Sequence, residues 1–197
     1  MTDLRIERLI GPQVQPYLPD VARLRIEVFR EFPYLYDGDM EYEQHYLATY
    51  SASPASLFVL VWDGDTIVGT STGVPMEDET DEFKQPFLDN AYDPARIFYF
   101  GESVLQRDYR GQGVGVRFFH EREDYARSMG RFRYTTFCAV ERPADHPRRP
   151  AAYVSLDAFW QRRGYTRHTE LHTEYTWRDL DETSESPKPM IFWLKAL

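Results

Sequence analysis

The chain has 197 residues, of which 42% are hydrophobic and 16% aromatic, and this suits one domain with a sizeable core. A formal net charge of −9 argues against non-specific nucleic-acid binding, which needs a basic face, and is compatible with a cationic substrate or with solubility alone. No apolar run approaches the roughly 18 residues of a membrane span, and Met1 to Arg5 show no apolar signal region. A single cysteine excludes an internal disulfide framework and is typical of a reducing compartment. We expect a cytoplasmic protein with no membrane or nucleic-acid partner.

Apolar periodicity and turn residues predict the elements of the first half of the chain. They are a strand, two helices and an antiparallel hairpin, at 4–10, 17–32, 40–51, 56–62 and 66–74. The segment 77–96 that follows is acidic and is broken by Pro86 and Pro94. It is long for a plain connection, so we expect a surface insertion with a short helix at 82–88 and consider a lid as its role.

The second half is predicted as strand, helix, strand, helix and two strands. These elements fall at 96–106, 116–129, 132–140, 156–163, 171–177 and 190–194. The strands on either side of the helix 116–129 can pair in parallel through a right-handed crossover. We therefore predict an α+β fold in which one mixed, mostly antiparallel sheet of about seven strands is flanked by helices, and we expect a single domain over 1–197.

Three spaced glycines separate the strand 96–106 from the next helix, in the run Arg110-Gly111-Gln112-Gly113-Val114-Gly115. Glycines let a ligand approach the backbone, and a helix N-terminus offers N–H groups and positive charge to an anion such as a phosphate. A dinucleotide fingerprint does not fit, because its third glycine falls on Val116, and no Lys-Ser/Thr pair follows as in a P-loop. An NAD(P)-binding domain is therefore the weakest of the alternatives.

The same run, read as Arg-x-x-Gly-x-Gly after a strand that ends in Val104-Leu105, resembles the acetyl-CoA-binding motif of the GNAT superfamily of N-acetyltransferases. The run from Phe159 to Tyr165 resembles the later helix of that family, which ends in a glycine and an aromatic residue. The resemblance implies that the turn holds the coenzyme A pyrophosphate, that the strand pairs with the pantetheine arm, and that the central parallel strands splay apart at the acetyl-CoA site. It implies a set of cofactor-binding residues, which are Val104, Leu105, Arg110, Gly111, Gln112, Gly113, Val114, Gly115, Val116 and Trp160.

The resemblance also implies a reaction, in which an acetyl group passes from acetyl-CoA to an amine by direct attack within a ternary complex. A backbone N–H near Val104 or Leu105 would hold the thioester carbonyl. We expect the acceptor to be a primary amine of a small molecule. The alternatives are a non-catalytic acyl-CoA sensor, and, less favoured, a protein or peptide N-acetyltransferase. No metal is expected, and a homodimer is considered.

The catalytic residues implied are Glu102 as the base and Tyr153 as the acid. Glu102 shares a strand face with Val104; Tyr99 and His146 stay open as alternative bases. The family commonly places a tyrosine where this chain has Trp160, whose indole cannot protonate a thiolate. Tyr153 is therefore the candidate acid, unless the thiolate leaves without one.

The acceptor side is expected between the first two helices, where Tyr34, Tyr36 and Asp37 would form an aromatic, acidic pocket suited to an ammonium group. Cys138 lies in an apolar strand, and we expect a buried apolar residue rather than an acyl acceptor. The histidines and glutamates at 168–174 alternate along a strand, where residues four apart are ~13 Å apart and cannot chelate one ion.

Overall fold

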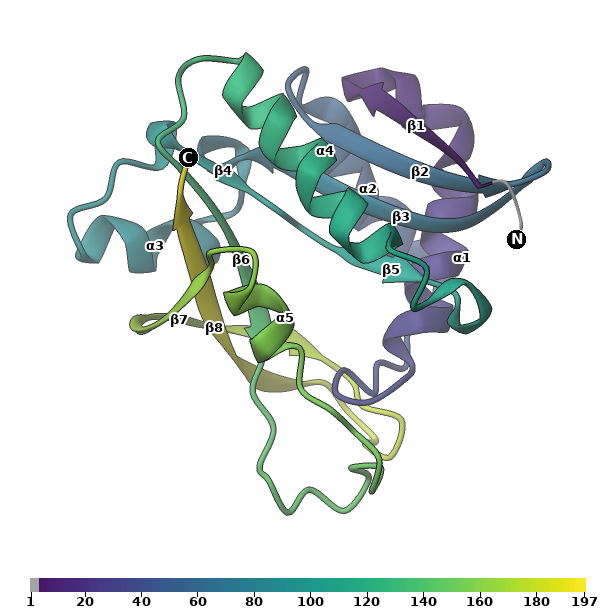
Figure 1. Ribbon diagram of the computed structural model, residues 1–197. Coiled ribbons are helices and arrows are strands. Elements are labelled where there is room, and N and C mark those ends of the chain that lie inside the picture. The colour runs from purple at the N-terminus through teal and green to yellow at the C-terminus, as the bar shows by residue number, and fades with distance from the viewer. Residues whose placement is uncertain (1–3) are drawn as a thin grey trace.

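The computed structural model describes residues 4–197 as one mixed sheet with helices packed on both of its faces (Figure 1). The strands are β1 (Arg5–Ile10), β2 (Leu57–Asp63), β3 (Thr66–Pro75), β4 (Ile97–Tyr99), β5 (Ser103–Leu105), β6 (Tyr134–Val140), β7 (Thr166–Trp177) and β8 (Ser186–Ala196). The helices are α1 (Leu18–Phe29), α2 (Met40–Ala52), α3 (Asp81–Asp89), α4 (Val114–Ser128) and α5 (Asp157–Gln161). The predicted fold class is confirmed.

The strand order is β1-β2-β3-β4-β6-β8-β7, and β5 lies off this path, paired with β3. Every pairing is antiparallel except that of β4 with β6, which is the predicted parallel pair. The strand predicted at 96–106 is in fact two strands. The N–H groups of Gly101 and Glu102 both turn to Thr72, bonding its carbonyl and its hydroxyl at 3.2 Å, so the chain bulges between β4 and β5.

Only glycine fits the first position of this bulge. A Cβ on Gly101 would lie 2.6 Å from Thr72 Oγ1 and 2.8 Å from the Tyr50 hydroxyl. After the bulge, β5 follows β3, while β6 continues with β8 (Figure 1). The sheet therefore opens between β5 and β6, as expected for the central strands.

Two cores lie on the two faces of the sheet. The first joins α1, α2 and α3 to the sheet, and the second joins α4 and α5 to the other face. Along β2, Phe58 and Leu60 enter the first core while Val59 and Val61 enter the second, which explains why this strand is continuously apolar. Among the helices of residues 4–197, none is long and apolar enough to cross a membrane.

The segment 77–96 contains the predicted short helix, and most of its residues are exposed. Its helix α3 buries Phe83 and Phe87 in the first core, where their rings lie 6.4 and 4.8 Å from the ring of Phe192. No residue of 77–96 lines the large cavity described below. The two phenylalanines stand four apart on one helix face, and this spacing carried the signal that the acidic residues obscured.

Strands β7 and β8 begin earlier than predicted, at Thr166 and Ser186. Strand β7 is an edge strand with β8 as its neighbour, and its polar residues face solvent. Its length is set by backbone pairing with β8, including a register shift between His168 and His172, rather than by an apolar pattern. Apolar periodicity therefore underestimates both strands.

Candidate active site

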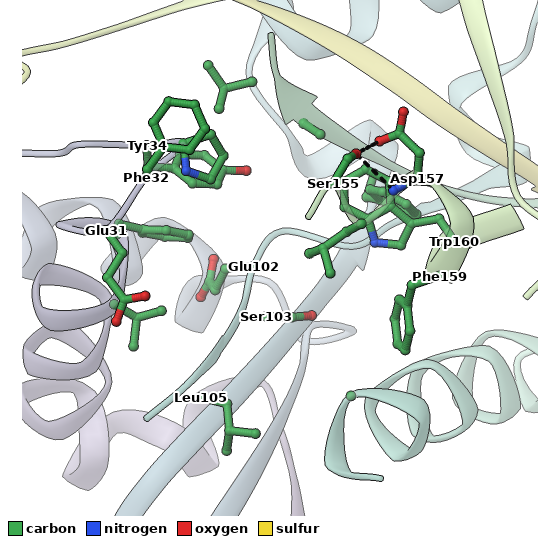
Figure 2. A pocket seen from close by; sticks show the side chains of 18 of the residues that line it. Glu31, Phe32, Tyr34, Glu102, Ser103, Leu105, Ser155, Asp157, Phe159 and Trp160 are labelled. Carbon is green, nitrogen blue, oxygen red and sulfur yellow. Dashed lines mark hydrogen bonds between the residues drawn. The ribbon is translucent and has the colours of Figure 1, made fainter. Parts of the chain in front are cut away.

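A cavity of about 1230 Å³ opens where β5 and β6 separate. Its walls come from the end of α1 and residues 30–35, the bulge and β5, the glycine turn, β6, and the segment 148–160. Figure 2 shows Glu31, Phe32 and Tyr34 on one wall and Phe159 and Trp160 on the opposite one. The volume exceeds the ~300–1,000 Å³ of ordinary small-molecule sites and suits a large ligand together with a second reactant.

The glycine turn has the backbone conformation that an anion cradle needs. Gly111 and Gly113 adopt φ values of +77° and +85°, and a Cβ on either would meet no atom within 4 Å. Within the protein, glycine is therefore required by the backbone conformation, and the open space beside it leaves room for a ligand to approach the backbone. Helix α4 starts at Val114 without a side-chain cap, and the N–H of Arg117 bonds the Gly113 carbonyl at 3.1 Å. The N–H groups before Arg117 in the first turn of α4 have no carbonyl partner within the helix, so they can face a phosphate.

Replacing Gly113 with alanine should raise the Kd for acetyl-CoA by about tenfold, because a side chain at positive φ costs roughly 1–2 kcal/mol and rotates the first N–H groups of α4. Isothermal titration measures the effect. Gly130→Ala is the matched control, since Gly130 also has a positive φ (+68°) and open space around it but does not line the cavity. Equal weakening in both variants would contradict a binding role for the turn.

Arg110 fastens the turn to its surroundings. Its Nε donates to the Leu105 carbonyl at 3.0 Å, and its guanidinium pairs with Glu31 at 2.8 Å. Although partial burial raises the pKa of Glu31, the Arg110 guanidinium lowers it on balance, so Glu31 is ionised. Of the cofactor-binding residues predicted, the ones that line the cavity are Leu105, Arg110, Gly111, Gly113, Gly115, Val116 and Trp160. The others do not line it, and they are Val104, Gln112 and Val114.

Strand β5 turns part of its backbone toward the cavity. The Glu102 carbonyl accepts from Thr72, and the Gln106 N–H donates to Val68, both at 3.0 Å. Antiparallel pairing uses alternate residues, so Val104, opposite Thr70, also bonds β3. The N–H groups of Ser103 and Leu105 face the open side, where a pantetheine arm or a thioester carbonyl can pair with them.

Glu102 lies at the floor of the cavity, between the two walls (Figure 2). The residue is 4% exposed, and Arg25 donates to its Oε2 at 2.6 Å. Arg25 is paired on its other side with Glu43. The second oxygen, Oε1, is buried and has no hydrogen-bond partner among the described residues. Burial raises the pKa of Glu102, against the opposing effect of the Arg25 guanidinium, so this carboxylate is well suited to accept a proton.

A smaller pocket of about 80 Å³, which we call the inner pocket, adjoins the cavity at Glu102. Its lining is mostly aromatic and comes from α1, α2, α3, the segment 34–36, the bulge at Gly101 and Glu102, and strands β4, β6, β7 and β8. The residues that it shares with the large cavity are Phe29, Tyr34, Gly101, Glu102 and Cys138. The residues that belong to it alone are Arg25, Tyr36, Tyr42, Phe83, Tyr99, Tyr175, Trp177 and Met190.

Two of the three predicted acceptor residues, Tyr34 and Tyr36, line the inner pocket, and burial raises the pKa of both hydroxyls. Asp37 lies outside both spaces, and its carboxylate pairs with Arg178 at 2.8 Å and with Arg30 at 3.5 Å. The acidic group of the pocket is therefore Glu102 rather than Asp37.

The candidate acid, Tyr153, lines the cavity on the side of Phe32, whose ring it meets edge-on at 4.7 Å. Burial raises the pKa of Tyr153, so its hydroxyl is protonated and able to donate. Trp160 forms the wall, with its ring 5.1 Å from the rings of both Phe137 and Trp193.

Of the two alternative bases, Tyr99 lines the inner pocket and His146 lies outside both spaces. Tyr99 is buried in the inner pocket, where its hydroxyl lies 3.2 Å from Cys138 Sγ. Burial raises the pKa of Cys138 to about 12, so the thiol stays protonated and is a poor nucleophile. His146 packs at 5.7 Å against the ring of Phe32 and does not line either space.

Sequence reasoning missed Arg25, the residue that holds Glu102. A signal was present, because Arg25 lies one helical turn from both Val21 and Phe29 in the apolar stripe of α1. A lone arginine on an apolar face predicts a buried carboxylate partner, but the pattern does not say which one. Glu102 is 77 residues away in the chain.

Comparisons with known proteins agree with this geometry. The acetyltransferase (GNAT) family model matches residues 21–151. No curated protein matches the chain significantly in sequence. Among solved structures, an acetyltransferase from Thermus thermophilus superimposes with a TM-score of 0.60 at 17% identity, covering 100% of both chains. A ribosomal-protein-alanine N-acetyltransferase from Brucella melitensis gives a TM-score of 0.61 at 11% identity, covering 98% of this chain and 99% of that one.

A GNAT-family acetyltransferase from Streptococcus pneumoniae is similar again, with a TM-score of 0.60 at 13% identity over 99% of this chain and 100% of the other. At these identities the structural likeness shows the fold alone. The family match is independent of it and extends from α1, through the bulge and the glycine turn, to the loop after β6. The chain belongs to the acetyltransferase (GNAT) family.

Proposed function

We propose that this acyltransferase moves an acetyl group from acetyl-CoA to the primary amine of a small molecule, by direct attack in a ternary complex. The observation that carries the proposal is the unpartnered, buried Oε1 of Glu102 at the junction of the large cavity and the inner pocket. Acetyl-CoA supplies the activated thioester. The glycine turn and the open side of β5 are the parts of the chain that fit it.

The proposal assigns a group of this chain to each catalytic requirement. Glu102 accepts the proton of the attacking amine, which approaches from the inner pocket. A backbone N–H of Ser103 or Leu105 donates to the oxygen on which negative charge develops. Tyr153 protonates the departing sulfur. Cys138, the chain's one cysteine, keeps its proton because of burial, and this favours direct attack over an acyl-enzyme.

The inner pocket supports a small acceptor. At about 80 Å³ it admits a compact group of a few heavy atoms, and aromatic rings close it on several sides. Neutral tyrosines beside a carboxylate hold an amine or an ammonium group through cation–π contacts and one charged hydrogen bond.

Two measurements on the wild-type protein test this function. Isothermal titration should show acetyl-CoA binding, and a thiol-reactive dye should show coenzyme A release that depends on an added amine. Binding without amine-dependent thiol release would instead support an acyl-CoA sensor. If acetyl-CoA does not bind at millimolar concentration, the proposal is wrong. Turnover with a peptide N-terminus but with none of the small amines would move the acceptor to the peptide class.

A further inference from the structure

The charge on the cavity wall is opposite to that of the whole protein. The chain carries a net charge of −9, yet eight arginines and four acidic residues line the cavity. An excess of positive charge around a site attracts anionic groups and raises their local concentration. Only the arginines without an acidic partner are available to an anionic ligand.

Most of these arginines are already occupied. Arg107 and Arg110 pair with Glu31, and Arg167 pairs with Glu141. Buried Arg122 bonds backbone carbonyls and lies 4.1 Å from the ring of Phe100.

Two further arginines also have acidic partners. Arg142 pairs with Asp179 at 2.8 Å, and Arg30 lies 3.5 Å from Asp37. This leaves Arg148 and Arg149, both exposed, whose guanidinium groups have no acidic partner among residues 4–197.

Arg149 lies beside the cavity wall that contains Phe32 and Tyr34, which we call the acceptor wall. Its guanidinium lies 4.8 Å from the ring centre of Tyr153 and 5.8 Å from that of Phe32. Phe32 precedes Tyr34, which lines both the cavity and the inner pocket. The arginine therefore stands beside the aromatic wall that leads to Glu102.

The loop that carries Arg149 is fixed at its base. Arg142, which is 9% exposed as a side chain, donates to the carbonyls of Pro33 and Tyr34, both at 2.8 Å, and pairs with Asp179. The loop 141–156 is thereby tied to the segment that forms the acceptor wall. This attachment holds the start of the loop beside Pro33 and Tyr34, and Arg149 itself contacts Phe32.

We propose that Arg149, assisted by Arg148, binds a carboxylate that the acceptor carries in addition to its amine, so that the substrate is an amino acid or a similar zwitterion. This inference rests on the proposed function. The amine enters the aromatic inner pocket at Glu102, and the carboxylate stays at the rim, where an unpaired guanidinium can bind it with two parallel hydrogen bonds. One end of the site selects positive charge and the other selects negative charge.

The glycine turn, and not Arg149, is the part of the cavity that fits the phosphates of coenzyme A. The glycine turn lies at the start of α4, beside Arg110, and Gly115 packs against Phe159, with a Cβ there only 3.3 Å from the Phe159 ring. Arg149 instead contacts Phe32 and Tyr153. Arg110 is occupied by Glu31 and the Leu105 carbonyl, whereas among the described residues the guanidinium of Arg149 contacts aromatic rings only.

Paired substrates test the proposal. Coenzyme A release is measured with each of several amino acids and with its carboxamide, for example phenylalanine and phenylalaninamide, and β-alanine and β-alaninamide, in the wild type, Arg149→Gln and Arg149→Glu. Wild type should favour the acid of an accepted pair by about tenfold or more in kcat/KM, as expected for a charge-assisted hydrogen bond. Arg149→Gln should abolish this preference, and Arg149→Glu should reverse it. The KM for acetyl-CoA should be unchanged.

The control is Arg133→Gln, because Arg133 is also exposed and without an acidic partner in the described chain but lies outside the cavity. Its substrate preference should match the wild type, and unchanged unfolding midpoints should show that all variants fold. Equal rates for acids and carboxamides overturn this inference and leave the proposed function intact. A higher KM for acetyl-CoA in Arg149→Gln also overturns it, since the arginine then serves the cosubstrate. If no amine releases coenzyme A, the proposed function itself fails.

Discussion

Replacing Glu102 with glutamine should lower kcat by about 10²- to 10⁴-fold, the usual contribution of a general base. Glutamine keeps the size of the side chain but cannot take the proton of the attacking amine. The Kd for acetyl-CoA, measured by titration, should stay within about twofold of the wild type, because the loss concerns only the transition state. The raised pKa of Glu102 adds a pH signature: wild-type kcat/KM rises with pH as the carboxylate loses its proton, at a pH above the ordinary glutamate range. This rise of kcat/KM with pH should be absent in Glu102→Gln.

Glu43→Gln is the control for this result. It removes the same kind of charge from the other side of Arg25, yet Glu43 lines neither the cavity nor the inner pocket. It should retain turnover within about tenfold of the wild type, since it perturbs only the neighbour of the base. Similar losses in Glu43→Gln and Glu102→Gln would show that the ion pairs, and not proton transfer, explain the effect.

Replacing Arg25 with leucine should destabilise the protein by about 3–5 kcal/mol, the cost of leaving a buried charge without its partner. The Arg25 side chain is 9% exposed, and it is shared between Glu43 and Glu102, whose side chains are 0% and 1% exposed. Chemical denaturation monitored by tryptophan fluorescence measures the loss. Arg23→Leu is the control on the same helix, because Arg23 is 42% exposed and its ion pairs with Asp20 and Glu27 are at 3.6 Å. It should cost less than about 1 kcal/mol.

The pH dependence of the Arg25→Leu variant has a definite sign. Arg25 lowers the pKa of Glu102 against the effect of burial, so its removal should raise that pKa further. A carboxyl with a raised pKa in the folded state favours folding while it is protonated and loses that contribution as the pH rises above its unfolded value. The stability deficit of the variant relative to the wild type should therefore grow as the pH rises above the folded-state pKa of Glu102 in the wild type, which itself lies above the ordinary glutamate value. The acid limb of the kcat/KM profile of the variant should move to higher pH. A deficit that shrinks as the pH rises would contradict this assignment.

The parts of the site that depend on local sequence could be predicted. The glycine turn is contiguous, and its place between a strand and a helix is readable from periodicity. Gly111 and Gly113 adopt the left-handed backbone, which glycine tolerates without strain and which was not predicted from the sequence. Parallel pairing of the strands on either side of α4 could be predicted because a strand–helix–strand connection allows it, and β4 and β6 are paired in this way.

The parts that depend on distant residues could not be predicted in the same way. Glu102 could be named from its strand, but its burial and its unpartnered oxygen arise from Arg25 and from a bulge that strand periodicity does not show. The inner pocket gathers rings from six separate stretches of chain. Asp37 could be proposed as its acid because it follows Tyr36, yet it turns instead toward Arg178. Adjacency in sequence says little about which of two neighbouring side chains enters a pocket.

The attachment made by Arg142 bears on how acceptor choice can change during evolution. One buried guanidinium fixes the base of the loop 141–156 to the carbonyls of Pro33 and Tyr34 and to Asp179, so the residues beyond it add little to the packing of the sheet. Substitutions, insertions or deletions at the tip of the loop can therefore alter which molecules enter the cavity, while the fold and the position of Glu102 stay unchanged. Because the attachment point is fixed, selection can change the acceptor without changing the residues around Glu102.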